Sequence, residues 1–295
     1  MALLDDIKFQ FKTGNILMQL IYVNGGVFLA LMFLRVLFFL TGNGSAFESV
    51  TYYLTIPSSP ELLLYRPWTL ITHMFVHNGF LHILFNMMWL YFGGQIFLNF
   101  LDSKKLLSTY ILGGISGAVF FILAMNLFPV FSDSAPFAVA EGASAAVLAI
   151  MVAAATTVPN FVVQLVLIGP VKLKYIAIVS VVLDVLLIPS GNAGGHFGHL
   201  GGALFGFVFA SQLKQGNDLS VDVLRPFFWI RDGFPKRERK IKVVHSKPKS
   251  DYEYNANKAS QQEQSDTILD KIKRSGYDSL SKKEKEILFK ASKDI

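Results

Sequence analysis

Residues 141–146 read Glu-Gly-Ala-Ser-Ala-Ala and open an apolar run that continues to about Val158. After Glu141 this run contains no ionisable side chain, yet the hydroxyl of Ser144 lies one turn in, among residues with almost no side-chain bulk. Small residues let other helices approach closely inside a membrane. Many serines in apolar helices only hydrogen-bond to a backbone carbonyl, so the meaning of Ser144 depends on the polar groups around it.

The composition of the whole chain predicts an all-α, polytopic membrane protein. Of the 295 residues, 52% are hydrophobic and 16% are charged, and the mean hydropathy is +0.44. Apolar runs of about 20 residues recur, which is the length that crosses a bilayer. The absence of cysteine excludes disulfides, thiolate zinc sites and cysteine nucleophiles.

The net charge of +6 is confined to the C-terminal tail. From Lys214 onward there are 19 Lys and Arg against 13 Asp and Glu, whereas the first 213 residues contain 8 of each sign. A basic tail beside a membrane surface accounts for this distribution and gives no support for nucleic-acid binding. We therefore expect the lipid bilayer, and no nucleic acid, among the partners.

Six apolar stretches predict six membrane spans. They are Asn15–Leu40, Phe80–Phe100, Leu106–Phe128, Glu141–Val158, a fifth that follows Lys172 and Lys174 and ends near Pro189, and Gly195–Leu213. The long segment from Thr41 to His77 is rich in Ser, Pro, Gly and aromatic residues, so we expect it to contain short helices at the membrane interface.

The spans divide the chain into four parts. Residues 1–14 form a predicted interfacial segment, 15–213 the six-helix membrane domain, 214–264 a basic flexible linker, and 265–295 a small cytoplasmic helical segment. In the last part, Ser281 and Glu284 have the spacing of a capping box. Because Lys104, Lys105 and the basic tail fall on one side, the positive-inside rule predicts that both termini are cytoplasmic. We expect a cell membrane, such as the bacterial inner membrane.

Four polar side chains share one depth in this arrangement. The second, fourth and sixth spans enter from the outer face, and His82, Asn86, Ser144 and His199 all lie in their first two turns. At about 1.5 Å per residue, these groups lie within roughly 5–10 Å of the outer hydrocarbon boundary. Polar groups inside a membrane are candidates for function. Ser144 is a candidate nucleophile with His199 as its base, and His82 and Asn86 can donate to an oxyanion.

Glycines around these residues predict close packing of the fourth and sixth spans. Gly198, Gly202 and Gly206 repeat every four residues, and such a ridge lets one helix press against small residues of another. We expect it to face Gly142 and Ala146, which brings His199 within hydrogen-bond reach of Ser144.

Other roles for the histidines stay open at this stage. The histidines could bind a metal, but the His-Glu-x-x-His signature is absent and no carboxylate stands beside a histidine pair, so we expect no metal and no cofactor. His73 and His77 are expected to shape the outer segment. His196 is a second choice for the base. Asp184 could orient His199, but we favour an aspartate satisfied by hydroxyls or backbone groups.

Four motifs between about Arg66 and Leu213 resemble, in order and spacing, those of the rhomboid intramembrane serine proteases. They are Arg66-Pro-Trp68-Thr-Leu-Ile-Thr-His73-Met-Phe-Val-His77, His82-Ile-Leu-Phe-Asn86, Gly142-Ala-Ser144 and His199-Leu-Gly-Gly202-Ala-Leu-Phe-Gly206. The resemblance implies a six-helix bundle, a Ser144–His199 dyad without a third acid, and an oxyanion site that includes the Ser144 N–H. Two positions depart from the family pattern: Ala145 replaces a glycine, and Thr69 replaces an arginine after Trp68.

The resemblance implies an intramembrane serine protease that cleaves in or next to transmembrane segments of other membrane proteins. The alternative is a catalytically silent rhomboid-like protein that binds membrane clients. A six-span transporter is disfavoured, because the polar groups cluster at one outer depth instead of lining a path through the midplane. The substrate, the role of the tail and the oligomeric state do not follow from the sequence.

Overall fold

A computed structural model describes residues 15–166, 168–220 and 251–291. The chain divides into two compact units, residues 1–234 and 235–295. The predicted interfacial segment 1–14 and the part of the predicted linker at 221–250 lie outside the described residues.

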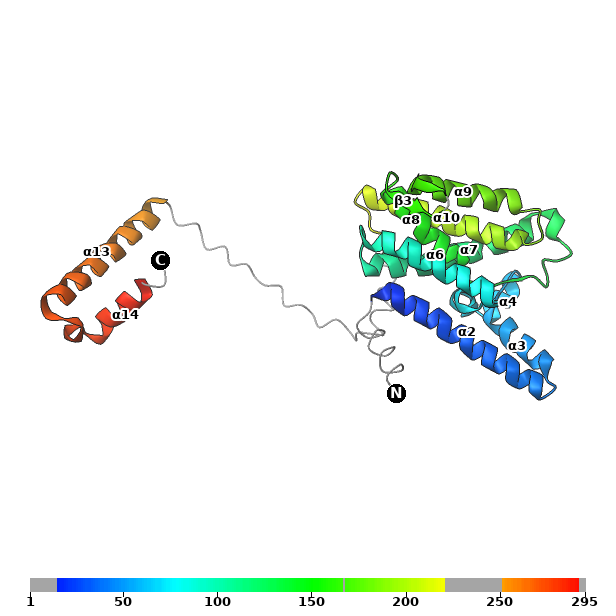
Figure 1. The fold of residues 1–295 in the computed structure, drawn as a ribbon, viewed down its shortest axis with the longest axis horizontal. Coiled ribbons are helices and arrows are strands. Elements are labelled where there is room, and N and C mark those ends of the chain that lie inside the picture. The colour runs from blue at the N-terminus through cyan, green and yellow to red at the C-terminus, as the bar shows by residue number, and fades with distance from the viewer. Residues whose placement is uncertain (1–14, 167, 221–250, 292–295) are drawn as a thin grey trace. The chain divides into compact units, whose positions relative to one another are not determined.

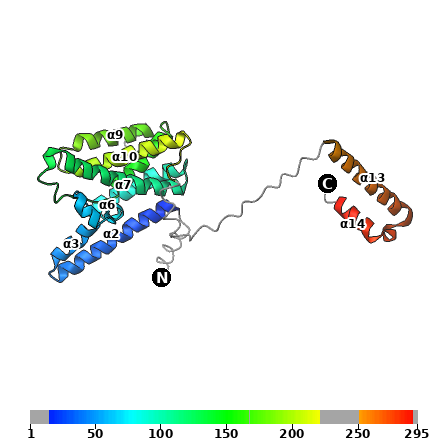
Figure 2. The same ribbon diagram turned by 180° about the vertical axis from the view of Figure 1, so that it is seen from behind.

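The first unit is a bundle of apolar helices (Figure 1, Figure 2). It consists of α2 (Ile16–Leu40), α6 (Phe80–Leu98), α7 (Ser103–Leu127), α8 (Ser144–Thr157), α9 (Leu173–Leu187) and α10 (Ala193–Lys214). By length and composition, α2, α6 and α7 can cross a membrane, and α8 is a shorter apolar helix. Each of these helices corresponds to one span predicted from the sequence.

α8 is the central helix of this bundle. It packs against α6, α7, α9 and α10, and ten of its 14 residues are buried. A helix that is apolar on all sides is stable only when protein or lipid encloses it. The alanine-rich run after Ser144 is therefore the core of the membrane unit.

Glycines of α10 allow its backbone to contact that of α8. A Cβ atom on Gly202 would overlap the carbonyl oxygen of Ala145, and one on Gly206 would overlap the carbonyl oxygen of Ala149. Neither glycine can carry a side chain without moving the helices apart. We expected these glycines to face Gly142 and Ala146. They contact Ala145 and Ala149 instead, on a neighbouring face of α8.

The same two alanines of α8 also meet a second pair of glycines, on α7. A Cβ atom on Gly113 would overlap that of Ala149, and one on Gly117 would lie 2.5 Å from that of Ala145. Gly198, which we expected to face the fourth span, lies against Gly117 instead. Residues eight apart on an α-helix differ by about 80° in direction, so a ridge that meets α8 at Gly206 has turned toward α7 at Gly198.

The segment between α2 and α6 contains short helices, as predicted. They are α3 (Gly44–Leu54), α4 (Pro60–Tyr65), α5 (Thr69–Thr72) and the 3₁₀ turn η1 (His73–Phe75). The short strand β1 (Ile56–Pro57) pairs antiparallel with β2 (Val139–Ala140), which follows the 3₁₀ turn η2 (Pro129–Phe131). This pairing attaches the segment to the chain directly before α8.

Aromatic and hydroxyl contacts also hold this segment in place. The Arg66 guanidinium lies over the rings of Tyr52 and Tyr53, at 4.5 and 4.1 Å, an arrangement that favours a cation. The indole N–H of Trp68 donates to the Tyr53 carbonyl at 2.9 Å, and the Thr69 hydroxyl donates to the Arg66 carbonyl at 2.7 Å. Thr69, which replaces the arginine of the family pattern, is itself buried and bonded within the segment.

A hairpin between α8 and α9 was not predicted. β3 (Val162–Leu165) pairs antiparallel with β4 (Gly169–Lys172). The β-branched residues Val162, Val163 and Val171 favour strands. However, each run is too short for its periodicity to distinguish a strand from the end of a helix.

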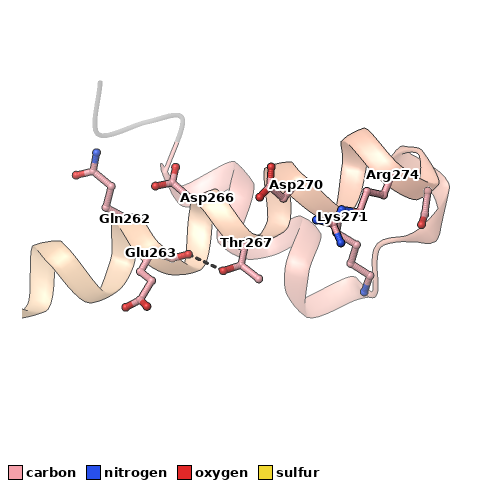
Figure 3. A pocket seen from close by; sticks show the side chains of 8 residues that line it. Gln262, Glu263, Asp266, Thr267, Asp270, Lys271 and Arg274 are labelled. Carbon is pink, nitrogen blue, oxygen red and sulfur yellow. Dashed lines mark hydrogen bonds between the residues drawn. The ribbon is translucent and has the colours of Figure 1, made fainter.

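The second unit is a helical hairpin of α13 (Asp251–Ser275), the 3₁₀ turn η3 (Tyr277–Ser279) and α14 (Lys282–Ala291). The predicted capping box is present, since the Ser281 N–H donates to Glu284 Oε2 at 2.7 Å and the Glu284 N–H to Ser281 Oγ at 3.4 Å. Lys271 of α13 pairs with Glu284 at 2.8 Å, and Figure 3 shows the charged face of α13 from which Lys271 extends.

The predicted boundary of the linker is wrong at its C-terminal end. Residues 251–264, which we assigned to a flexible linker, belong to α13. This stretch lacks an apolar stripe, but it is rich in Ala, Gln, Glu and Lys, which have high intrinsic helix propensity. Propensity extended the helix beyond the apolar residues that we used to detect it.

The glycine contacts predict that Gly206→Ala destabilises the bundle. The added methyl group overlaps the Ala149 carbonyl, and overpacking of this kind costs about 1–3 kcal/mol. The matched control is Gly26→Ala in α2, where a Cβ atom meets nothing within 4 Å and alanine favours the helix by about 1 kcal/mol. Thermal unfolding of the purified protein in detergent should give a lower Tm for Gly206→Ala alone. Equal Tm values for both variants would contradict the close contact.

Candidate functional site

Ser144 is the first residue of α8, and the turn before it is not helical. From the sequence we expected the helix to begin at Glu141, but Gly142 has a φ of +114°, a conformation that ends helical geometry and suits glycine. The first N–H groups of an α-helix have no partner within the helix. The hydroxyl and the N–H of Ser144 therefore lie together at an uncapped helix N-terminus.

Two histidines of the outer segment hold this turn. The Gly142 N–H donates to the His73 carbonyl at 2.8 Å, and the Ala143 N–H donates to His77 Nε2 at 3.4 Å. His73 Nδ1–H in turn donates to the Thr69 carbonyl at 2.7 Å. His73 and His77 thus shape the outer segment, as expected, and the same contacts position Ser144.

Ser144 and His199 are in direct contact. The Ser144 hydroxyl donates to His199 Nε2 at 2.6 Å, although the two residues are 55 positions apart. His199 lies in the second turn of α10, whose N-terminus is capped by the Asn192 side chain, which accepts from the Gly195 N–H at 3.3 Å. The approach of α10 to α8 at Gly202 brings the two side chains together.

Asp184 corrects an expectation. We favoured an aspartate satisfied by hydroxyl or backbone groups, but its Oδ1 atom lies 2.7 Å from His199 Nδ1 and 2.8 Å from His196 Nδ1. The nearby hydroxyl of Ser180 donates to its own helix, at the Ile176 carbonyl. The two histidines are three residues apart on α10 and share a helix face, so both can reach one carboxylate on α9.

His82 and Asn86 of α6 lie on the other side of Ser144. A Cβ atom on Gly142 would lie 2.7 Å from His82 Nε2, so the imidazole covers the turn before Ser144. The Asn86 amide donates one hydrogen to the His82 carbonyl at 2.9 Å, and the amide has a second hydrogen to offer. His82 and Asn86 both line the cavity that also contains Ser144.

These side chains open into one cavity of about 760 Å³. Its polar end contains the serine, the two histidines His82 and His199, and Asp184, and its walls include the aromatic side chains of Phe85 and Trp89. Both aromatic rings are exposed in the isolated bundle. Such a combination of apolar walls and a few convergent polar groups is typical of a ligand site.

Glu141 contributes a carboxyl group to the lining of this cavity. It precedes Gly142 and lines the same space as Ser144. Burial raises the pKa of this carboxyl group above its ordinary value, since removal from water disfavours the charged form.

Asp184, His196 and His199 are also the group that could hold a metal ion, because their ligand atoms lie within 4.8 Å of one another. No carboxylate stands beside a histidine pair in the sequence, but the fold brings Asp184 to His196 and His199 from a different helix. However, both Nδ1 atoms lie at hydrogen-bond distance from the same carboxylate oxygen. A carboxylate only accepts, so this geometry fits two N–H donors better than two metal ligands, which must be deprotonated at the same atoms.

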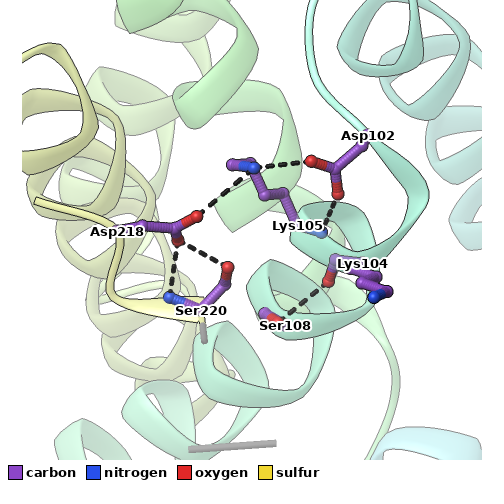
Figure 4. Close-up of polar contacts among 6 residues, drawn as sticks. All are labelled: Asp102, Lys104, Lys105, Ser108, Asp218 and Ser220. Atoms are coloured by element: carbon purple, nitrogen blue, oxygen red, sulfur yellow. Dashed lines mark hydrogen bonds and ion pairs between the residues drawn. The ribbon is translucent and has the colours of Figure 1, made fainter. Parts of the chain in front are cut away.

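A second polar cluster lies at the N-terminal end of α7 and just after the C-terminal end of α10 (Figure 4). Lys105 pairs with Asp102 at 2.5 Å and with Asp218 at 3.3 Å, and Asp218 accepts from the Ser220 N–H at 2.9 Å. Partly exposed pairs of this kind contribute at most about 1 kcal/mol each. The cluster ties the start of α7 to the chain after α10 and is remote from the cavity.

Two family models match the chain. The family described as Rhomboid domain matches residues 65–215, which is half of the chain and includes every residue of the cavity named above. A second family, described as a family of unknown function (DUF6576), matches residues 249–294 and so covers the helical hairpin.

Two relatives are similar to part of the chain. It is 30% identical over 160 residues to RHOMBOID-like protein 12, mitochondrial, of Arabidopsis thaliana, which covers 51% of the chain and 48% of the relative. It is 30% identical over 102 residues to Rhomboid protease GlpG of Pectobacterium atrosepticum, which covers 35% of the chain and 36% of the relative. The chain thus spans half or less of the length of these relatives.

His73 and His77, which hold the turn before Ser144, predict that the free energy of unfolding decreases in acid. Burial lowers the pKa of His73 and of His77 from 6.5 to about 4, so the folded protein keeps both neutral. Below pH 6.5 the unfolded chain binds protons that the folded chain does not, and stability falls as pH drops toward 4. Each histidine contributes up to about 3 kcal/mol to this loss.

Thermal unfolding between pH 7 and pH 4.5 measures the effect. The variant His73→Gln/His77→Gln should be less stable at pH 7, and its Tm should change less with pH than that of the wild type. A wild-type pH dependence in this variant would assign the acid sensitivity to other groups.

Proposed function

The chain belongs to the rhomboid family, and on that premise we propose that it is an intramembrane serine protease. It hydrolyses peptide bonds in or next to transmembrane segments of other membrane proteins, with Ser144 as nucleophile and His199 as base. The observation that carries this proposal is the 2.6 Å contact between Ser144 Oγ and His199 Nε2 at the polar end of an accessible cavity. A serine needs such a base to attack a carbonyl carbon.

The reaction follows the chemistry of acyl transfer. As Ser144 Oγ bonds to the substrate carbonyl carbon, its proton passes to His199 Nε2, and the carbonyl oxygen becomes an oxyanion. His199 then returns the proton to the leaving amine when the peptide C–N bond breaks, which leaves an acyl group on Ser144. A water molecule then attacks the ester carbon as His199 takes its proton, and His199 returns that proton to Ser144 Oγ when the ester C–O bond breaks, which releases the second product as a carboxylic acid.

We assign three donors to the oxyanion: the Ser144 N–H, His82 and Asn86. The N–H of Ser144 is free of intrahelical bonding at the first position of α8, and its dipole favours negative charge. His82 lies over Gly142, and Asn86, which shares a face of α6 with His82, lines the same cavity and has a second amide hydrogen to donate. Donors that are in place before the reaction stabilise the developing charge without reorganisation.

The depth of the site restricts what it can cut. A peptide bond in a regular helix is a poor target, because its carbonyl already accepts from an N–H four residues on, and helices do not open readily in lipid. The predicted position near the outer boundary gives access to water. We expect substrates to be single spans with Gly, Pro or polar residues in their outer part, cut beside a small residue.

The chain is a multi-pass membrane protein, and the charge distribution supports a finer assignment. We place both termini and the helical hairpin in the cytoplasm of a cell carrying the protein in its cell membrane, because Lys104, Lys105 and the basic tail share that side. The domain layout that we propose is a membrane domain at 15–213, a linker, and the hairpin from Asp251.

The proposal predicts that Ser144→Ala and His199→Ala each abolish cleavage of a transmembrane substrate in detergent or liposomes. The double variant should be no worse than either single variant, because the pair acts as a unit. Labelling by a fluorophosphonate probe should disappear in Ser144→Ala. Cleavage by Ser144→Ala would refute a serine mechanism, and unlabelled, inactive wild-type protein would favour the catalytically silent client-binding alternative.

The oxyanion donors predict a different phenotype. His82→Ala and Asn86→Ala should each lower kcat by about 10²-fold or more, whereas the probe should still label Ser144, since nucleophile and base are unchanged. The rate of cleavage and the extent of labelling are measured on the same preparations. Wild-type kcat in both variants would limit these residues to holding α6 in place.

A further inference from the structure

We propose that Asp184 is a positioning residue for His199, so that this chain works through a Ser–His–Asp triad and not through a serine–histidine pair alone. The inference rests on the proposed function and goes beyond it, since the family resemblance implies no third acid. Three helices contribute one member each: Ser144 begins α8, His199 lies on α10 and Asp184 on α9.

The geometry fixes the roles of the two imidazole nitrogens of His199. Nδ1 lies 2.7 Å from Asp184 Oδ1, and Nε2 lies 2.6 Å from Ser144 Oγ. Because a carboxylate has no proton to donate, Nδ1 must carry the hydrogen of the neutral ring. Nε2 is then the free base that faces the serine hydroxyl. Without Asp184, the opposite tautomer would present an N–H to Ser144 and could not accept its proton.

The carboxylate also stabilises the charge that forms during the reaction. When His199 takes the proton of Ser144, the ring becomes an imidazolium with an anion 2.7 Å away. The side chain of Asp184 is 12% exposed and that of His199 is 25% exposed, so little water screens the pair. Charges interact more strongly in such an environment than in water.

His196 explains how a carboxylate is held in this apolar segment. It donates from Nδ1 to the same Oδ1 atom at 2.8 Å, and its ring stands edge-on to that of His199, with ring centroids 5.8 Å apart. A buried carboxylate is costly unless it is bonded, and two N–H donors orient it. We therefore assign His196 to Asp184, and not to Ser144.

Other titratable groups near His199 act in a different way. His82 on α6 and Glu141 on the turn before α8 line the same cavity. Within the described residues, neither the His82 ring nor the Glu141 carboxyl group is bonded to His199 Nδ1, which pairs with Asp184. Removal of either changes the field at the site, whereas removal of Asp184 also changes which nitrogen carries the proton.

The test compares Asp184→Asn with the wild type in the full-length protein, purified in detergent. Cleavage of a transmembrane substrate and the rate of fluorophosphonate labelling are measured from pH 5 to pH 9. Asp184→Asn should lower kcat by about 10²- to 10⁴-fold with KM within about twofold. The acidic limb of its pH–rate profile should move to lower pH, because the imidazolium loses its anionic partner.

Matched variants separate positioning from folding. Asp184→Glu restores the carboxylate and should recover at least about tenfold of the lost kcat. His196→Ala should cost less than Asp184→Asn. Asp218→Asn removes a carboxylate at the far end of α10 and should leave kcat unchanged. Thermal unfolding identifies any variant that fails to fold, in which case Asp184→Glu and His196→Ala carry the comparison.

Several results would overturn the inference. Wild-type kcat and pH profile in Asp184→Asn, with cleavage still abolished by Ser144→Ala, would leave the proposed protease with a simple dyad. Activity lost in His196→Ala but kept in His199→Ala would make His196 the base. Loss of wild-type activity on chelation, restored by zinc, would make the three residues metal ligands. Cleavage by Ser144→Ala would remove the proposed function itself, which is a separate failure.

Discussion

The contact on which the rest of the membrane unit depends is the meeting of three helices at Ala145 and Ala149. Their carbonyl oxygens fill the space that side chains at Gly202 and Gly206 would occupy, and their methyl groups fill the space at Gly117 and Gly113. Because no large side chains separate the three helices, their backbones come into direct contact, and dispersion forces between them stabilise the packing. Because α10 is held against α8 at Ala145, the residue after Ser144, His199 has a fixed position relative to the Ser144 hydroxyl.

The same contact accounts for a departure from the family pattern. The family commonly has a glycine where this chain has Ala145, and an additional methyl group there could have pushed the helices apart. Its Cβ atom instead lies at Gly117 of α7, where neither residue has further side-chain atoms. The methyl group therefore adds packing between α7 and α8 and does not lengthen the distance between α8 and α10.

The outer segment supplies the second constraint on the proposed site. A histidine carbonyl and a histidine ring nitrogen bind the two N–H groups before Ser144, so the turn with Gly142 in its left-handed conformation is held from outside the helix. The segment is itself held by the contacts of Arg66 and Trp68 and by the pairing of β1 with β2. A buried, neutral His77 is needed because a protonated ring could not accept from Ala143. Folding of the outer segment and geometry of the serine are thus linked.

The sequence by itself determined the class of the protein and the succession of apolar helices, because hydropathy acts locally along the chain; the shared depth of Ser144, His199, His82 and Asn86 stays a prediction from helix rise. It also indicated that α8 and α10 pack through small residues. Only the tertiary structure decided that α8 begins at Ser144, that Gly198 faces α7 and that Asp184 is bonded to both histidines of α10. These facts depend on the rotation of each helix about its axis and on contacts between residues far apart in the chain. A pattern of residue types constrains neither of them, because the sequence of α9 does not show which neighbouring helix Asp184 faces.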